Sequence, residues 1–215
     1  MSGRRFLLAT RSAGKLRELR EIFSGFGLDV VDLSALGIVE TAAEDDLEQY
    51  DTFEENALAK TRYFFELSGG LPTFGDDSGM VVDALGGEPG VYSKRWSGRK
   101  DLTGRALDDA NNAKLVARMN DALKRDPAGY TDAGRYVSVA AFKDATGEVI
   151  RRGEVGGRVL TKPRGSGGFG YDPYFDAPDL GGTFAESTIE NTAASSHRAR
   201  AFRALLTALR AQGRV

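Results

Sequence analysis

Two adjacent carboxylates, Asp76 and Asp77, stand between apolar runs in the segment Phe74-Gly75-Asp76-Asp77-Ser78-Gly79. Side chains alternate between faces along an extended segment, so only one of the two acids can face a given site. We therefore expect one acid to be chemical and the other structural. A carboxylate at the end of a buried strand, followed by a small hydroxyl residue and a glycine, suits binding a divalent cation or orienting a water. The alternative is an Asp-containing turn in which both acids are solvated.

A turn from strand to helix is predicted at Ala9-Thr10-Arg11-Ser12-Ala13-Gly14-Lys15. The segment imitates a phosphate-binding P-loop but departs from that pattern at two positions. Such a turn still favours an anion, because its free backbone N–H groups point outward, Thr10 and Ser12 add hydroxyls, and Lys15 adds a positive charge. The alternative is an ordinary N-capped helix with a solvated lysine.

Asn56 and Lys60 lie four residues apart in a predicted helix, so they share one of its faces. The long side chain of Lys60 can reach into a cleft. The alternative is that Lys60 pairs with Glu54 or Glu55 on the helix surface, an interaction worth only tenths of a kcal/mol.

A glycine-rich loop is predicted at Gly165-Ser166-Gly167-Gly168-Phe169-Gly170-Tyr171-Asp172-Pro173. Glycine lets the backbone approach a ligand closely, and Phe169 can lay its face on a flat heterocycle. A purely structural glycine corner is the alternative.

The segment Ser195-Ser196-His197-Arg198 opens the final predicted helix. Positive charge is disfavoured at a helix N-terminus, so His197 and Arg198 there predict an anionic or carbonyl-bearing ligand beside them. The alternative is a histidine packed in the core.

Composition limits the class of protein. The chain has 215 residues, is 41% hydrophobic, carries a net charge of -2 and contains no cysteine. A chain of this size can form one large α/β domain, which we expect to span residues 1–215. The weak negative charge argues against a polymeric nucleic acid as partner. Without thiols, a metal site must use oxygen ligands or the sole His197, and a reducing cytoplasmic location is expected.

The apolar run at residues 6–9 is too short for a signal peptide, and no segment approaches the ~20 apolar residues that span a bilayer.

Apolar periodicity predicts alternating helices and strands. Mixed elements of this kind predict an α/β fold with a curved mixed sheet flanked by helices. The predicted strands cover residues 6–10, 28–33, 72–76, 80–84, 135–142 and 149–156, and the predicted helices cover residues 16–25, 52–67, 107–123 and 196–211.

Together these segments resemble the inosine triphosphate pyrophosphatase family, also called Ham1-like, over nearly the whole chain. The resemblance rests on ordered motifs: Leu8-Ala9-Thr10 with Gly14-Lys15 and Glu18-Leu19, Thr52-Phe53 with Glu55-Asn56-Ala57 and Lys60, Asp76-Asp77-Ser78-Gly79, Ala84-Leu85-Gly86-Gly87 with Pro89-Gly90-Val91-Tyr92-Ser93, Gly167-Gly168-Phe169-Gly170-Tyr171-Asp172-Pro173, Thr183-Phe184-Ala185-Glu186 and Ser196-His197-Arg198. It implies an elongated two-lobed α/β fold with a central nucleotide-binding cleft, usually a homodimer. It also implies Mg²⁺-dependent hydrolysis of ITP, dITP and XTP to the monophosphate and pyrophosphate.

The resemblance also implies roles for single residues. Asp77 would be the general base and a metal ligand, and Glu48 would assist with Mg²⁺. Phe169 would stack on the base. The implied substrate-binding residues are Thr10, Arg11, Ser12, Ala13, Gly14, Lys15, Lys60, Ser78, Phe169, Gly170, Tyr171, Asp172, His197 and Arg198.

Several positions depart from the family pattern. Asp46 and Asp51 are alternatives to Glu48 as the second metal ligand. Lysines common toward the carboxyl end are replaced here by Gly182 and Thr192. Arginines such as Arg11 and Arg164 could take over their work. Two other functions stay open: a pyrophosphatase of modified nucleotides like those of the Maf family, and a nucleotide-binding protein without turnover.

Overall fold

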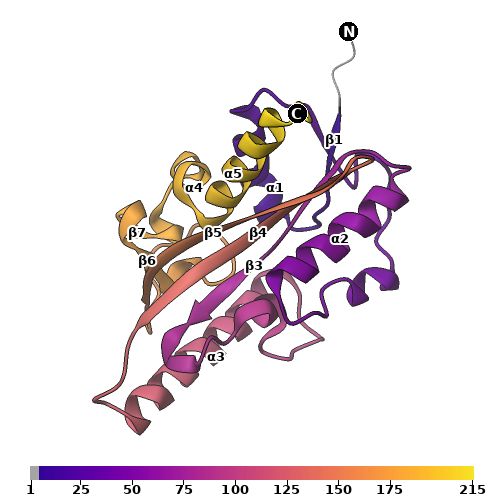
Figure 1. Ribbon diagram of the computed structural model, residues 1–215. Helices are drawn as coiled ribbons and strands as arrows, with labels where there is room; N and C mark the ends of the chain where they lie inside the picture. Colours follow the sequence, from indigo (N-terminus) through magenta and orange to yellow (C-terminus); the bar gives the residue numbers. More distant parts are fainter. Residues whose placement is uncertain (1–4) are drawn as a thin grey trace.

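The structure, a computed structural model, describes residues 5–215 (Figure 1). Within them, seven strands form one open sheet in the order β2-β1-β3-β4-β5-β6-β7. β1 pairs in parallel with β2 and β3, whereas every later pair is antiparallel, so the predicted mixed sheet is confirmed. The predicted division into two lobes around a cleft stays a prediction. The strands are β1 Phe6–Leu8, β2 Val30–Asp32, β3 Thr73–Val82, β4 Ala133–Asp144, β5 Gly147–Val159, β6 Phe175–Ala177 and β7 Gly182–Thr183.

Helices flank the sheet on both faces, with α1, α4 and α5 on one and α2 on the other (Figure 1). The α-helices are α1 Ala13–Ser24, α2 Phe53–Leu67, α3 Gly104–Arg125, α4 Ile189–Ser195 and α5 His197–Ala211. Short 3-10 turns lie between them: η1 Ala42–Asp46, η2 Asp83–Leu85, η3 Gly90–Arg95, η4 Asp172–Tyr174, η5 Pro178–Leu180 and η6 Phe184–Glu186. No helix in the described part of the chain is long and apolar enough to cross a membrane.

Strand β3 sorts its side chains onto two faces by alternation. Phe74 joins an apolar cluster with α1 and α5, and Met80 joins a second apolar cluster with α3. Between them on this face lie Asp76 and Ser78, both in contact with α5. Asp77 points the other way, toward α2. The polar positions of this strand are thus enclosed by apolar packing at both ends.

The acidic pair lies within one continuous strand, which corrects the prediction of two strands at residues 72–76 and 80–84. Asp76 pairs with Ala140 and Asp77 with Val139 in an unbroken antiparallel ladder. Both acids are buried, at 0% and 5% exposure, so the alternative of a solvated turn is wrong. Continuous pairing with β4 satisfies the backbone through the polar stretch, a tertiary effect that local sequence does not reveal.

The two glycines that flank the acids serve close packing. A Cβ on Gly75 would lie 2.4 Å from Oγ1 of Thr61 in α2, and one on Gly79 would lie 2.3 Å from the carbonyl oxygen of Gly90. Neither space admits a side chain. Glycine therefore lets α2 and η3 approach β3 closely around the acids.

Other predicted boundaries differ modestly from the structure. Strand β1 ends at Leu8 and not at residue 10, and the β4–β5 hairpin extends beyond both predicted strands. Strands β6 and β7 and helix α4 were not predicted. They contain only three, two and seven residues, too few for a periodic pattern to stand out.

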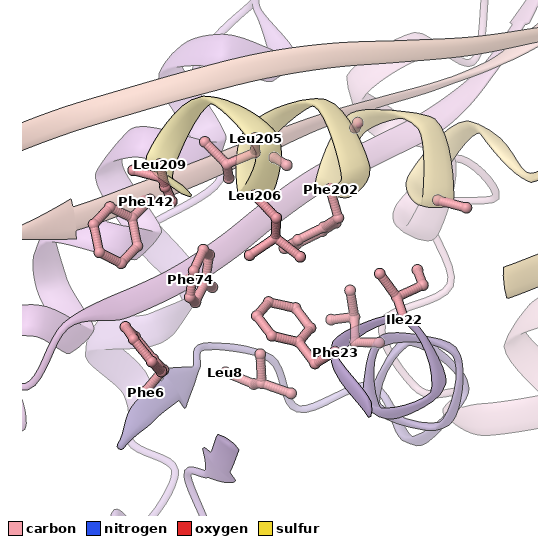
Figure 2. Close-up of a cluster of buried hydrophobic side chains, with 14 of the residues drawn as sticks. Phe6, Leu8, Ile22, Phe23, Phe74, Phe142, Phe202, Leu205, Leu206 and Leu209 are labelled. Atoms are coloured by element: carbon pink, nitrogen blue, oxygen red, sulfur yellow. The ribbon is translucent and has the colours of Figure 1, made fainter. Parts of the chain in front are cut away.

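An aromatic cluster holds α1 and α5 against the sheet (Figure 2). The ring of Phe74 lies 4.6 Å from that of Phe142 and 4.8 Å from that of Phe23, centroid to centroid. Phe6 and Phe202 complete the group around it. These rings pack β1, β3, β4, α1 and α5 together, on the same face of β3 as Asp76 and next to it along the strand.

We expect Phe74→Ala to lower the free energy of unfolding by about 3 to 5 kcal/mol, because it removes a fully buried ring and leaves a cavity. Val39, which is 77% exposed, provides the control, and Val39→Ala should change stability by no more than about 0.5 kcal/mol. Urea unfolding followed by circular dichroism measures both. Equal stability of the two variants would contradict the central place of Phe74.

Candidate functional site

Asp76 is the buried centre of a group of charges between β3, α1 and α5. Its Oδ2 lies 3.0 Å from Nζ of Lys15 and accepts a hydrogen bond from Nε of Arg198 at 3.2 Å. Its main-chain carbonyl accepts a hydrogen bond from Lys60 of α2. Burial by itself raises the pKa of this carboxyl group, but the three cations outweigh burial and hold the pKa below its usual value. Asp76 is therefore a fixed anion that organises three cations.

Arg198 contacts three groups of the protein. It pairs with Glu18 of α1 and with Asp76, and its Nη2 donates to Oγ of Ser78 at 2.9 Å. Its positive charge at the N-terminus of α5 is thus balanced by two buried carboxylates. The cation at this helix end is thus explained without a ligand, and the predicted contact of Arg198 with substrate stays a prediction.

His197 is packed against aromatic rings. Its imidazole stacks on Tyr136 at 4.7 Å and 9°, and Phe184 meets it edge-on. Burial, and then the charge of Arg198, lowers its pKa well below the ordinary value, so the ring is neutral. Within residues 5–215 its Nδ1 has no hydrogen-bond partner. The predicted packing of the histidine is confirmed, and its unpaired Nδ1 is buried. The predicted contact of His197 with substrate stays a prediction.

The predicted turn from β1 into α1 forms as a capped helix start. Oγ of Ser12 accepts from the backbone N–H of Lys15 at 3.3 Å, and Oγ1 of Thr10 accepts from that of Ser12 at 3.2 Å. The Lys15 side chain is only 15% exposed and points to Asp76, so the alternative of a solvated lysine is wrong. Burial lowers the pKa of Lys15. The turn therefore presents a partly desolvated cation beside two hydroxyl groups.

Arg11 points away from this group. Its guanidinium pairs with both oxygens of Glu44 and donates to the carbonyl oxygen of Ile38 at 2.8 Å. Arg164, the second arginine considered as a replacement for missing lysines, pairs with Asp176 at 2.6 Å. Both guanidinium groups are thus satisfied by protein carboxylates. Their predicted contact with phosphate stays a prediction.

The two positions at which the family resemblance implies lysine lie at the sheet edge and in the helix before α5. Gly182 is in β7, where a Cβ would lie 2.9 Å from Oε2 of Glu186. Thr192 is in α4, and its hydroxyl donates to the carbonyl oxygen of Ile189 at 2.9 Å. Neither position supplies a cation in this chain.

Lys60 links α2 to the acidic segment that follows η1. Its Nζ donates to Oε1 of Glu48 at 2.6 Å, and the side chain is 9% exposed. The predicted alternative of surface pairing is wrong, because Glu54 pairs with Arg152 and Glu55 accepts from Thr52. The charge of Lys60 lowers the pKa of Glu48 to about 2. Glu48 is therefore ionised at neutral pH.

Asp77 faces α2 on the side of β3 opposite Asp76. Its Oδ2 accepts from Nδ2 of Asn56 at 3.0 Å, and its Oδ1 accepts from the backbone N–H of Ser78 at 2.8 Å. Burial, and then the negative charge of Glu48, raises the pKa of Asp77 to about 6. A carboxylate with this pKa can hold or release a proton near neutral pH.

Asp77 and Glu48 offer the carboxylates for a divalent cation. In the described residues, no group of three or more acidic or histidine side chains is placed to hold a metal. Two carboxylates fit Mg²⁺, which commonly takes its other ligands from water and substrate phosphates. The charge of Glu48 acts on Asp77, whereas Asp46 is engaged by Gln49. The set therefore fits Mg²⁺ with Glu48 as the better second ligand.

The glycine-rich loop brings Phe169 onto the first turn. A Cβ on Gly14 would lie 2.4 Å from Cδ1 of Phe169, so the ring rests directly on the backbone there. The guanidinium of Arg198 lies 5.9 Å from the same ring's centroid. Phe169 as a residue is 37% exposed. The glycine-rich loop, in the last quarter of the chain, thus contacts the phosphate-loop-like turn near the amino terminus.

Asp172 fixes the other end of this loop. Its Oδ2 accepts from the backbone N–H of Phe169 at 2.8 Å, and its Oδ1 accepts from the hydroxyl of Tyr136 at 3.1 Å. Next to it, the hydroxyl of Tyr171 donates to the carbonyl oxygen of Ser93 at 2.8 Å. Burial raises the pKa of Asp172 to about 7.

Comparison with known proteins identifies the same family as the sequence motifs do. A sequence model of the Ham1 family matches residues 6–208. The chain belongs to the Ham1 family. It is 45% identical to a dITP/XTP pyrophosphatase of Frankia alni over 96% of this chain and 97% of that protein. It is 46% identical to one of Symbiobacterium thermophilum, over 94% and 92%.

Solved Ham1 structures share the fold. A HAM1 protein from Coxiella burnetii matches with a TM-score of 0.77 and 28% identity, covering 95% of this chain and 98% of that one. A nucleoside-triphosphatase, dITP/XTP pyrophosphatase, from Mycobacterium abscessus matches with a TM-score of 0.65 and 36% identity, covering 94% and 98%. The resemblance to the Ham1 family is confirmed.

Four residues that shape the site of this Ham1 protein have no site role predicted from the sequence, although Glu18 belongs to one of the motifs of the resemblance. They are Glu18, Asp108, Asn112 and Tyr136, each bonded to a predicted site residue. Glu18 had a usable signal, since it is a charge on the apolar stripe of α1. The others contact residues more than thirty positions away, and no local pattern marks them.

We expect the stability of the wild-type protein to fall more steeply between about pH 5 and pH 8 than that of Asp172→Asn. The folded-state pKa of Asp172, about 7, exceeds the ordinary unfolded value of about 3.9. Its contribution is therefore fully present below the unfolded pKa and is lost as the pH rises through the folded pKa. The slope difference should approach about 1.4 kcal/mol per pH unit at most. Denaturant unfolding across this range measures it, and parallel stability curves would contradict the raised pKa.

Proposed function

We propose that this protein hydrolyses non-canonical purine nucleoside triphosphates, namely ITP, dITP and XTP, to the monophosphate and pyrophosphate. One observation carries the proposal: Lys15 and Lys60 converge on Asp76, beside the Asp77 and Glu48 pair. Cations suit a triphosphate, and an acid of raised pKa suits activation of water. Relatives named dITP/XTP pyrophosphatase, 45% and 46% identical, support the substrate class.

In the proposed mechanism Asp77 orients the attacking water and takes its proton. Its pKa of about 6 leaves it ionised at neutral pH while keeping it basic enough to accept a proton. Lys15 and Lys60 bind the phosphates and align the link between the α and β phosphorus atoms. Asp77 and Glu48 would hold Mg²⁺, which when bound would neutralise phosphate charge. Asp76 keeps both lysines in place.

The purine would lie on the exposed face of Phe169, near His197 and Arg198. Hydrogen-bond donors there favour an oxygen at C6, because an oxygen accepts whereas the amino group of adenine donates. A donor facing a donor in a closed pocket leaves both unsatisfied. Recognition of a 6-oxo group therefore separates ITP and XTP from ATP.

The homodimer and the cytoplasmic location that the family resemblance implies belong to the same proposal. A nucleotide-binding protein without turnover would have no use for the Asp77 and Glu48 pair. A Maf-like preference for modified pyrimidine nucleotides is distinguished by the substrate panel below.

We expect kcat/KM for ITP to exceed that for ATP by about 10³ or more, because adenine leaves buried donors unpaired. The measurement is pyrophosphate release with Mg²⁺ across ITP, dITP, XTP, GTP, ATP and modified pyrimidine triphosphates. Equal kcat/KM for ATP and ITP would sink the proposed recognition of the 6-oxo group. Faster turnover of modified pyrimidine triphosphates would favour the Maf-like alternative.

We expect Asp77→Asn to lower kcat for ITP by at least about 100-fold, because it removes the general base and a metal-facing charge while keeping the side-chain volume. Nucleotide affinity should change little. Asp121→Asn, at an exposed position on α3, is the control and should behave as wild type. If Asp77→Asn stays active while Asp76→Asn is inactive, the two acids have exchanged roles.

A further inference from the structure

Two side chains of α3 hydrogen-bond to one residue, Gly170, of the loop that carries Phe169. The backbone N–H of Gly170 donates to Oδ2 of Asp108 at 2.9 Å. The carbonyl oxygen of Gly170 accepts from Nδ2 of Asn112 at 3.0 Å. An acceptor and a donor four residues apart share one face of the helix, so they match both backbone groups of Gly170. We call this arrangement the Gly170 clamp.

We propose that Asp108 and Asn112 are positioning residues for the purine, because the Gly170 clamp sets the place of the Phe169 ring. This inference rests on the proposed function, in which the purine stacks on Phe169. Neither residue touches the proposed phosphate-binding group around Asp76. Their effect should therefore fall on the base and not on the phosphates.

Gly170 makes no side-chain contact of its own. It adopts a φ of +62°, and a Cβ built on it would meet nothing within 4 Å. It also stands where the chain passes from the exposed ring of Phe169 to the buried ring of Tyr171. A residue without a side chain in open space is fixed only through its backbone, and the clamp binds both of its backbone polar groups.

The side chain of Asn112 is buried beside Gly170, where its amide can donate to the carbonyl oxygen. The residue is 6% exposed, and its Oδ1 has no partner within residues 5–215. Burying an amide with one polar atom unpaired costs free energy. The hydrogen bond from Nδ2 to Gly170 offsets this cost and so explains why an asparagine is found at this position.

Helix α3 is a rigid support for the clamp. Leu115 and Met119 are fully buried in the cluster that also contains Tyr171. The neighbouring Asn111 accepts from the backbone N–H of Ser97 at 2.7 Å and donates to the carbonyl oxygen of Lys94 at 3.0 Å. The same helix face thus holds the η3 segment and the Phe169 loop in a fixed relation.

The test compares Asp108→Ala and Asn112→Leu, which each remove one clamp bond, with Asp108→Asn, which keeps a carbonyl oxygen to accept from Gly170. Asp109→Ala, at an exposed neighbouring position, is the matched control. Four quantities are measured: KM and kcat for ITP, the Kd of IMP, the Kd of inorganic pyrophosphate, and amide hydrogen exchange in residues 165–173.

We expect Asp108→Ala and Asn112→Leu to raise KM for ITP and the Kd of IMP about 10-fold or more, with kcat and the Kd of pyrophosphate changed by less than about 3-fold. Exchange in residues 165–173 should become faster. Asp108→Asn and Asp109→Ala should resemble wild type. Unchanged IMP affinity, or equal weakening of IMP and pyrophosphate, would overturn the proposal.

The exchange measurement needs no substrate and separates the two hypotheses. If wild type hydrolyses no purine triphosphate, the proposed function and the stacking role fail together, whereas faster exchange in the variants still shows that the clamp holds the loop. If wild type hydrolyses ITP and the variants show neither faster exchange nor weaker IMP binding, only the clamp fails. Should Asn112→Leu not fold, the pair Asp108→Ala and Asp108→Asn decides the outcome.

Discussion

A carboxylate with no exposed surface, Asp76, can stay ionised only because cations surround it. Lys15 of α1 and Arg198 of α5 contact this carboxylate, and Lys60 of α2 donates to the main-chain carbonyl of the same residue. One residue of the central strand therefore contacts three helices. Removing one of these cations would weaken the compensation of the buried carboxylate. The proposed phosphate-binding lysines are therefore held by the same interaction that joins the helices to the sheet.

The alternation of β3 gives the two acids different environments although they are neighbours in sequence. Asp76, among cations, has a lowered pKa, whereas Asp77, buried beside the charge of Glu48, has a raised one. Two titratable groups whose environments push their pKa values apart can divide structural and chemical work. Continuous pairing with β4 makes this division rigid, because neither acid can rotate to the other face without breaking the ladder.

The remaining part of the site is built by long-range contacts to a glycine-rich loop. Phe169 rests on Gly14, Asp172 is held by Tyr136, and Gly170 is held from α3. Glycines allow the loop to follow this path, but they add no rigidity of their own. Order in the loop therefore comes from side chains elsewhere in the chain.

The sequence by itself determined the mixed α/β class, the long helices and hairpin, and the membership of the Ham1 family, because these follow from local periodicity and ordered motifs. It also placed Asp76 and Asp77 on opposite faces. Only the tertiary structure decided that they lie within one strand, that carboxylates of the protein balance Arg198, and that α3 grips Gly170. These features depend on residues distant in sequence, whose approach is set by packing and by the need to pair buried charges.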